Sequence, residues 1–129
     1  MSDFAVDTQA LIRFMEGKRV SPPSAQEILE KSDQGIHRII IPAIVLMEVL
    51  YLFEKNRITK SILDIEYLIS KSINYRFEPL SLDILKTAST IHDVPELHDR
   101  LIAATAVYLN IPLLTNDPEL IASQNVITL

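Results

Sequence analysis

Short apolar segments alternate with helical patterns along this chain. Residues 4–6, 39–41 and 113–115 are short runs of apolar or β-branched side chains, and such runs predict buried strands. The second of these strands is expected over 35–41, with 39–41 at its core. Between them, apolar side chains recur at the spacing of helices, for example over 9–16 and 43–55. Strands that alternate with helices are typical of a parallel sheet covered by helices on both faces. The sequence therefore predicts one α/β domain over residues 1–129.

The remaining segments complete the predicted order of elements. Further helices are expected over 24–33, 59–72, 81–90 and 118–122, and further strands over 76–80 and 126–128. We expect Ser24 and Glu27 to form a capping box at the start of the helix over 24–33. The helix over 43–55 is apolar on nearly every side, so we expect it to be largely buried.

Composition excludes several classes of site. The chain has two glycines and no cysteine, which argues against glycine-rich phosphate loops and excludes disulfides, thiolate metal sites and a cysteine nucleophile. The longest apolar runs have about nine residues, against the roughly 20 that span a bilayer. With no signal-like segment at the N-terminus, we expect a cytoplasmic protein with no membrane attachment. The formal net charge of −5 is not that of a protein that binds nucleic acid by charge alone.

Three aspartates occupy related places in the predicted sheet. Asp7 follows the first strand, Asp117 follows the strand over 113–115, and Asp99 opens the small-residue helix that precedes that strand. The carboxyl ends of parallel strands meet at one edge of the sheet, where ligands bind in α/β proteins. We therefore expect these three carboxylates to lie close together.

A fourth acid, Glu48, lies within the most apolar helix of the chain. Its neighbours one turn away are apolar or aromatic, and no basic residue within one turn can pair with it. Each acid alone has an ordinary structural explanation, as a helix cap, a first-turn acid or half of a distant salt bridge. Together, converging carboxylates repel one another unless some are protonated or a cation lies between them.

The residue types predict which cation would fit such a site. Carboxylate oxygens without histidine or cysteine ligands favour Mg²⁺ or Mn²⁺ over zinc. One or two such ions promote phosphodiester hydrolysis, because they lower the pKa of a bound water and stabilise the leaving oxygen. Two ions would also neutralise four of the five net negative charges, which would let an acidic protein accept a polyanion.

These acids, in their local contexts, resemble the PIN-domain ribonucleases, and most closely the VapC-like toxins of toxin–antitoxin pairs. The similarity extends over essentially the whole chain. The matching motifs are Val6-Asp7-Thr8 with Leu11-Ile12 behind it, Glu48 within IVLMEVL, His98-Asp99-Arg100-Leu101-Ile102-Ala103-Ala104-Thr105-Ala106, and Leu114-Thr115-Asn116-Asp117.

The resemblance implies a fold, an activity and partners. The implied fold is a three-layer α/β/α sandwich around a mainly parallel sheet of four or five strands. The implied activity is a Mg²⁺- or Mn²⁺-dependent endoribonuclease that acts as a homodimer and is inhibited by a cognate antitoxin covering the acidic site. By motif match, the catalytic and metal-binding residues would be Asp7, Glu48, Asp99 and Asp117, with Thr115 and Thr8 as supporting residues.

Basic and apolar residues suggest further contacts. Arg100, which adjoins Asp99, and Arg13 are the candidates to bind substrate phosphate, and basic clusters after the first helix and between 55 and 60 could also contact RNA. His98 is expected to be a surface or supporting residue, because metal-activated water needs no histidine base. Residues 43–68 carry more apolar side chains than the small core is expected to bury. We therefore expect one face of this helix hairpin to pack against a second copy of the chain.

Two other classes of function remain open on the sequence alone. A PIN-like module that binds nucleic acid or protein without catalysis would keep the fold and lack divalent-ion binding. A receiver-like signalling domain also groups acids around Mg²⁺ at strand ends, but it needs an acidic pair after the first strand and a lysine near the last one. Here Thr8 follows Asp7, and no lysine occurs after Lys86.

Overall fold

A four-stranded parallel sheet forms the centre of the fold in the computed structural model, which describes residues 2–129. The strand order is β3-β2-β1-β4. Ala5 of β1 pairs with Ile40 of β2 on one side and with Leu113 of β4 on the other. The strands are β1 (Asp3–Val6), β2 (Arg38–Pro42), β3 (Tyr75–Glu78) and β4 (Leu113–Leu114). The α/β class and the parallel sheet are therefore confirmed.

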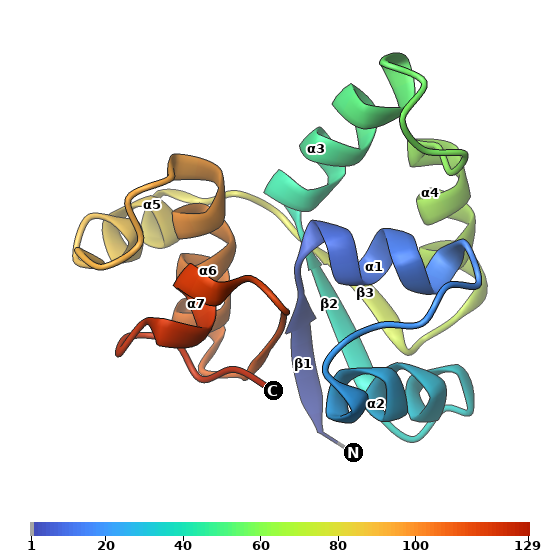
Figure 1. Cartoon of the computed structure of the whole chain (residues 1–129), viewed down its shortest axis with the longest axis horizontal. Helices are drawn as coiled ribbons and strands as arrows, with labels where there is room; N and C mark the ends of the chain where they lie inside the picture. Colours follow the sequence, from blue (N-terminus) through green and yellow to red (C-terminus); the bar gives the residue numbers. More distant parts are fainter. Residues whose placement is uncertain (1) are drawn as a thin grey trace.

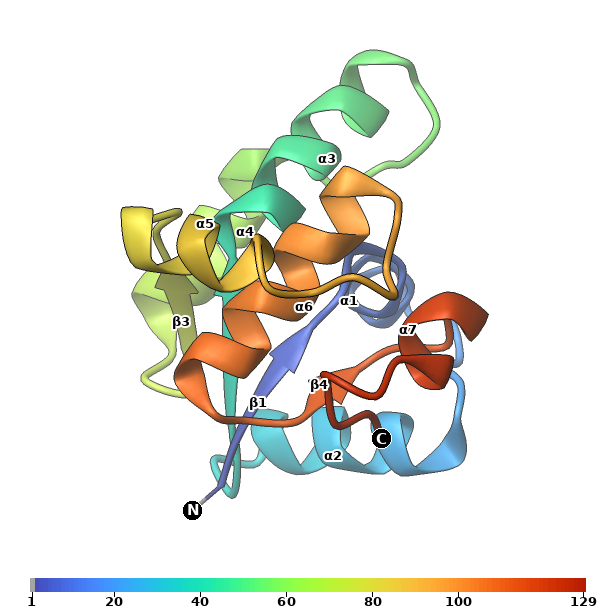
Figure 2. The same ribbon diagram turned by 90° about the vertical axis from the view of Figure 1, so that its left-hand side faces the viewer.

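Helices cover both faces of the sheet, as the three-layer prediction requires. Figure 1 shows α5 and α6 on one side of β1 and α1 and α2 on the other, and Figure 2 shows the same arrangement after a quarter turn. The helices of the described residues are α1 (Thr8–Met15), α2 (Pro23–Asp33), α3 (Ala43–Glu54), α4 (Ile62–Lys71), α5 (Leu82–Ala88), α6 (Leu97–Leu109) and α7 (Pro118–Ala122).

Small side chains let α6 lie directly on the sheet. Ala103, Ala104 and Ala106 of α6 are fully buried, and so is Ala5 of β1, a strand that α6 contacts. Short side chains on both elements allow close approach of the backbones, and native cores pack without voids at such contacts. The close packing fixes the start of α6, and therefore Asp99, relative to the carboxyl end of β1.

The start of α2 differs from the prediction. α2 begins at Pro23 with Pro22 as the N-cap and no side-chain hydrogen bond, so the predicted capping box of Ser24 and Glu27 is wrong. Proline suits the first position of a helix because its missing N–H has no partner there in any case. A capping box is formed instead at α4, where Ser61 and Asp64 satisfy each other's backbone N–H groups.

The predicted burial of α3 is also wrong. Only Ile44, Val45 and Val49 of this helix are buried, while Tyr51 is 55% exposed and Phe53 is 43% exposed. Figure 1 shows the reason, since the second half of α3 and the loop to α4 extend beyond the sheet.

The end of the chain forms less regular structure than predicted. The strand expected over 126–128 is reduced to a single parallel bridge between Thr128 and Leu113 of β4. Within residues 2–129, no helix is long and apolar enough to cross a membrane.

Candidate active site

Asp7 lies at the carboxyl end of β1 and caps α1. Its Oδ1 accepts a hydrogen bond from the backbone N–H of Ala10 at 2.9 Å, and its Oδ2 accepts one from the hydroxyl of Thr115. Only 7% of the residue is exposed. Burial raises the pKa of Asp7 above its ordinary value, although both hydrogen bonds act in the opposite direction. Asp7 is thus a buried carboxylate held by two donors.

Thr115 connects Asp7 to Asp117. Its hydroxyl donates to Asp7 and accepts the backbone N–H of Asp117 at 3.0 Å. Asp117 itself caps α7, because its Oδ1 accepts the N–H groups of Glu119 at 2.9 Å and Leu120 at 3.2 Å. Since β1 and β4 are parallel neighbours, their carboxyl ends bring Asp7 and Asp117 together as the sequence predicts.

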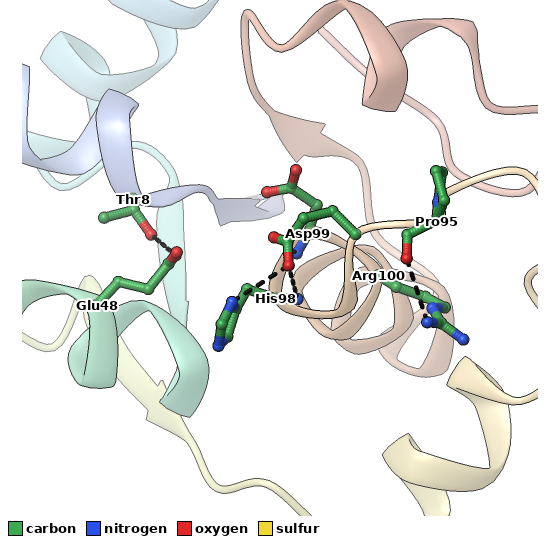
Figure 3. Close-up of polar contacts among 7 residues, drawn as sticks. Thr8, Glu48, Pro95, His98, Asp99 and Arg100 are labelled. Atoms are coloured by element: carbon green, nitrogen blue, oxygen red, sulfur yellow. Dashed lines mark hydrogen bonds and ion pairs between the residues drawn. The ribbon is translucent and has the colours of Figure 1, made fainter.

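Glu48 reaches the site from the first half of α3. Its Oε1 accepts a hydrogen bond from the hydroxyl of Thr8, the first residue of α1. Figure 3 shows Thr8 and Glu48 together on one side of the site. The half-buried glutamate is therefore held by a neutral hydroxyl, and its second oxygen accepts no hydrogen bond within residues 2–129.

Asp99 is the third residue of α6 and not its first, because the helix begins at Leu97 with Glu96 as the N-cap. Glu96 accepts the backbone N–H groups of His98 at 2.9 Å and of Asp99 at 3.1 Å. In the part of the chain that the structure describes, the Asp99 carboxylate accepts no hydrogen bond. Burial, followed by the negative charge of Asp117 and more distant acids, raises the pKa of Asp99 to about 6.

The four predicted acids line one cleft of about 1010 Å³. Thr8, Arg13 and His98 line the same cleft, and Met47, Tyr51 and Ile102 contribute apolar or aromatic surface. The acids come from four separate segments: the end of β1, the middle of α3, the start of α6 and the segment after β4. The sequence prediction that these residues share one place in the fold is therefore supported by the geometry.

The donor atoms in the cleft fit a hard divalent cation. Glu48 and Asp117 each keep one oxygen free of the hydrogen bonds described above, and both oxygens of Asp99 are free within residues 2–129. Carboxylate oxygens of this kind suit Mg²⁺ or Mn²⁺. No three acidic or histidine side chains in residues 2–129 are arranged closely enough to hold an ion as they stand. The acids share the cleft without forming a closed cage.

The two arginines predicted to bind phosphate lie in different places. Arg13 lines the cleft, and its Nε donates to the carbonyl of Arg19 at 2.8 Å. Arg100 instead turns towards the carbonyl of Pro95, 3.4 Å from its guanidinium, on the other side of the site from Glu48 (Figure 3). Arg13 therefore remains a candidate for substrate binding, and the geometry does not favour Arg100.

Other residues at the site were not singled out by the sequence. Tyr51 and Asn116 line the cleft. The sequence positions of both residues could have identified them, since Tyr51 lies one helical turn after Glu48 and Asn116 precedes Asp117. Glu96 is the cap of α6, and its Oε2 lies 3.2 Å from Nδ1 of His98.

Asp93, in the loop before α6, anchors the C-terminal segment. Its carboxylate accepts hydrogen bonds from Ser123 Oγ, the Gln124 backbone N–H and Asn125 Nδ2, each at 2.8 Å. The loop before α6 is thereby tied to the segment after α7.

Solved structures with similar folds include a VapBC2 complex from Rickettsia felis bound to a promoter DNA fragment. It has 21% sequence identity to the chain and a TM-score of 0.71, and the similarity covers 98% of this chain and 97% of that one. DNA-bound VapBC from Salmonella typhimurium has 17% identity and a TM-score of 0.71, over 100% and 98% of the two chains. VapC20 from Mycobacterium tuberculosis, described as a toxin that cleaves the sarcin-ricin loop, has 17% identity and a TM-score of 0.64, over 95% and 96%.

The sequence itself identifies the family. Comparison with curated proteins by sequence gave no significant match. The family model of the PIN domain, however, matches residues 4–123, a range that includes all four acids of the cleft. The chain therefore belongs to the PIN-domain family.

Proposed function

We propose that the protein is a Mg²⁺- or Mn²⁺-dependent endoribonuclease and the toxin of a toxin–antitoxin pair. Asp7, Glu48, Asp99 and Asp117 would hold one or two ions. A bound ion would supply the Lewis-acid chemistry that hydrolyses phosphodiester bonds. Thr115 and Thr8 would orient Asp7 and Glu48 through their hydroxyl groups, and Arg13 would contact a phosphate of the RNA.

The environment of Asp99 is the observation that carries this proposal. Its carboxylate is partly buried, has no hydrogen-bond donor among the described residues, and is repelled by the charges of Asp117, then Glu96, and then Glu48 and Asp7. An acid in such a place is unfavourable as an anion unless a cation compensates it. A helix cap or a structural ion pair does not account for it, because Glu96 already caps α6 and no base pairs with Asp99 in residues 2–129. Asp99 lies in the first turn of α6, where the helix dipole favours an acid, but its pKa is nevertheless raised to about 6.

The proposed partners have separate support. The similar solved structures from Rickettsia felis and Salmonella typhimurium are described as VapBC complexes, which supports an antitoxin as a binding partner. A homodimer is supported by apolar side chains that the isolated chain leaves exposed on the hairpin of α3 and α4, such as Leu63 and Tyr67. The cytoplasm remains the expected compartment.

Ion binding and RNA cleavage test the proposal together. Calorimetric titration with Mn²⁺ should show binding to the parent protein and a loss of at least tenfold in affinity in Asp99→Asn. RNA cleavage should require Mg²⁺ or Mn²⁺ and should be abolished in Asp7→Asn and Asp99→Asn. Asp83→Asn, which removes an exposed acid of α5, is the matched control. Undiminished cleavage in both site variants would overturn the proposal.

The non-catalytic alternative predicts a different result. A PIN-like binding module would bind RNA or protein without divalent ions, and Asp99→Asn would not change its ligand affinity. The receiver-like alternative is wrong, because the chain belongs to the PIN family and its sheet order β3-β2-β1-β4 differs from the 2-1-3-4-5 order of receiver-type sheets.

A further inference from the structure

Two loops beside the cleft carry a group of basic side chains that we call the basic rim. Lys18 and Arg19 lie in the loop between α1 and α2, and Lys55, Arg57 and Lys60 lie in the loop between α3 and α4. These five residues are among the twelve lysines and arginines of an otherwise acidic chain. All are exposed except Lys60, which is half-buried.

Glu16 holds the two loops together. Its Oε2 accepts hydrogen bonds from the backbone N–H of Thr59 at 2.9 Å and from the Thr59 hydroxyl at 2.8 Å. Its Oε1 lies 3.3 Å from Nζ of Lys18. Figure 1 shows the end of α1 next to the start of α4. Segments about 40 positions apart in the sequence therefore form one surface, and the charge of Glu16 is already engaged within it.

The basic rim is continuous with the cleft at two points. Arg13 lines the cleft and bonds through Nε to the carbonyl of Arg19 in the rim. Tyr51 also lines the cleft, with 55% of its surface exposed. Nζ of Lys55 in the rim lies 5.6 Å from the centre of the Tyr51 ring. A chain-like ligand seated at the acids can thus pass from the cleft to the rim over Arg13 and Tyr51.

The chemistry of this path fits a single-stranded nucleic acid. Lysine and arginine side chains gathered on one surface bind nucleic-acid phosphates, and an exposed aromatic ring stacks on a base without requiring a particular sequence. We propose that the basic rim binds the phosphate backbone of single-stranded RNA on one side of the cleavage site, and that a base stacks on Tyr51. This proposal rests on the proposed function for the choice of RNA as the ligand.

RNA binding without divalent ions tests the rim separately from cleavage. The test variant is Arg19→Gln, Arg57→Gln and Lys60→Gln combined. The control carries the same loss of charge elsewhere, as Lys71→Gln, Arg76→Gln and Lys86→Gln combined. Affinity for a fluorescently labelled single-stranded RNA is measured by anisotropy in EDTA over a range of salt concentrations, with circular dichroism to verify folding.

We expect the rim variant to bind at least tenfold more weakly at low salt, with the slope of log affinity against log salt reduced by about 2. The control should retain the parent affinity and slope within twofold. Tyr51→Leu should weaken binding by roughly fivefold to a hundredfold with no change in the slope, because it removes stacking and no charge.

Three results would overturn the rim proposal: no RNA binding by the parent, equal binding by the rim and control variants, or loss of affinity in the rim variant only for a purified protein partner. RNA binding that depends on the rim, in a protein that cleaves no RNA with Mg²⁺ or Mn²⁺, would support the rim and overturn the proposed nuclease function alone.

Discussion

Thr115 at the end of β4 donates a hydrogen bond to Asp7 at the end of β1, although the two residues are 108 positions apart in the sequence. The same hydroxyl accepts the backbone N–H of Asp117. Thr115 is fully buried. One hydroxyl group therefore sets the positions of two of the acids proposed to hold the metal.

Replacing Thr115 by valine should damage both stability and ion binding. The substitution keeps the shape of the side chain but leaves the buried carboxylate of Asp7 without one of its donors, which costs about 1–3 kcal/mol in the free energy of unfolding. Affinity for Mn²⁺ should fall by about 10–100-fold, as for other residues that orient metal ligands. Urea unfolding and calorimetric titration measure the two effects.

Thr115→Ser is the matched control, since it keeps the hydroxyl and loses only a methyl group. Thr115→Ser should keep most of the parent's affinity for Mn²⁺, even if its free energy of unfolding is lower than that of the parent. Equal Mn²⁺ affinity in the valine and serine variants would show that the hydroxyl does not position the acids.

Without divalent ions, the ionisation of Asp99 should reduce the stability of the protein as the pH rises. The pKa of Asp99 is raised from 3.8 to about 6 in the folded protein, so between these values the folded state binds more protons than the unfolded state. Stability then falls with increasing pH. Burial also raises the pKa of Asp7, so the ionisation of Asp7 should reduce stability in the same way.

The measurement compares the parent with Asp99→Asn, because acids such as Asp93, whose pKa is lowered by hydrogen bonds, give the opposite pH dependence. As the pH rises from 3.8 to about 6, the free energy of unfolding of the variant should increase relative to that of the parent. Saturating Mn²⁺ should reverse the difference at the upper end. A constant difference across this range would contradict the prediction.

The positions of the aspartates could be predicted from the sequence because they depend on local rules. Short apolar runs mark strands, and the carboxyl ends of parallel strands meet at one edge, so Asp7 and Asp117 had to be near each other. Thr115 was placed with them by the motif match to the PIN-domain ribonucleases. Glu48 was identified by the mismatch between its charge and its apolar neighbours.

The direction of side chains and the extent of burial could not be predicted in the same way. Arg100 is adjacent to Asp99 in sequence, but successive residues of a helix point about 100° apart, and Arg100 turns to Pro95 instead of the cleft. The exposure of Tyr51 depends on how far α3 extends beyond the sheet. The contact of Glu16 with Thr59 joins two loops, and no local pattern specifies their pairing.

The exposed apolar face of α4 should mediate dimer formation. Leu63 and Tyr67 are one turn apart on this helix and are 68% and 65% exposed, so they present adjacent apolar surface. Light scattering coupled to size-exclusion chromatography should give a dimer for the parent and a monomer for Leu63→Lys combined with Tyr67→Lys. Ile121→Lys combined with Ile127→Lys, at other exposed apolar positions, should remain dimeric. A monomeric parent, or a dimeric α4 variant, would contradict the prediction.

Enlarging Ala104 should move the start of α6 and weaken the site without touching any acid. Ala104 is fully buried at the face of α6 that packs in the core, and extra methylene groups in a well-packed core cost about 1–3 kcal/mol of stability. In Ala104→Leu, the helix can relieve this strain only by shifting, and Asp99 shifts with it. We therefore expect Mn²⁺ affinity to fall together with the free energy of unfolding. Tyr108→Leu, at an exposed position of the same helix, should change neither. An Ala104→Leu protein that is destabilised but binds Mn²⁺ with the parent affinity would show that the packing of α6 does not set the position of Asp99.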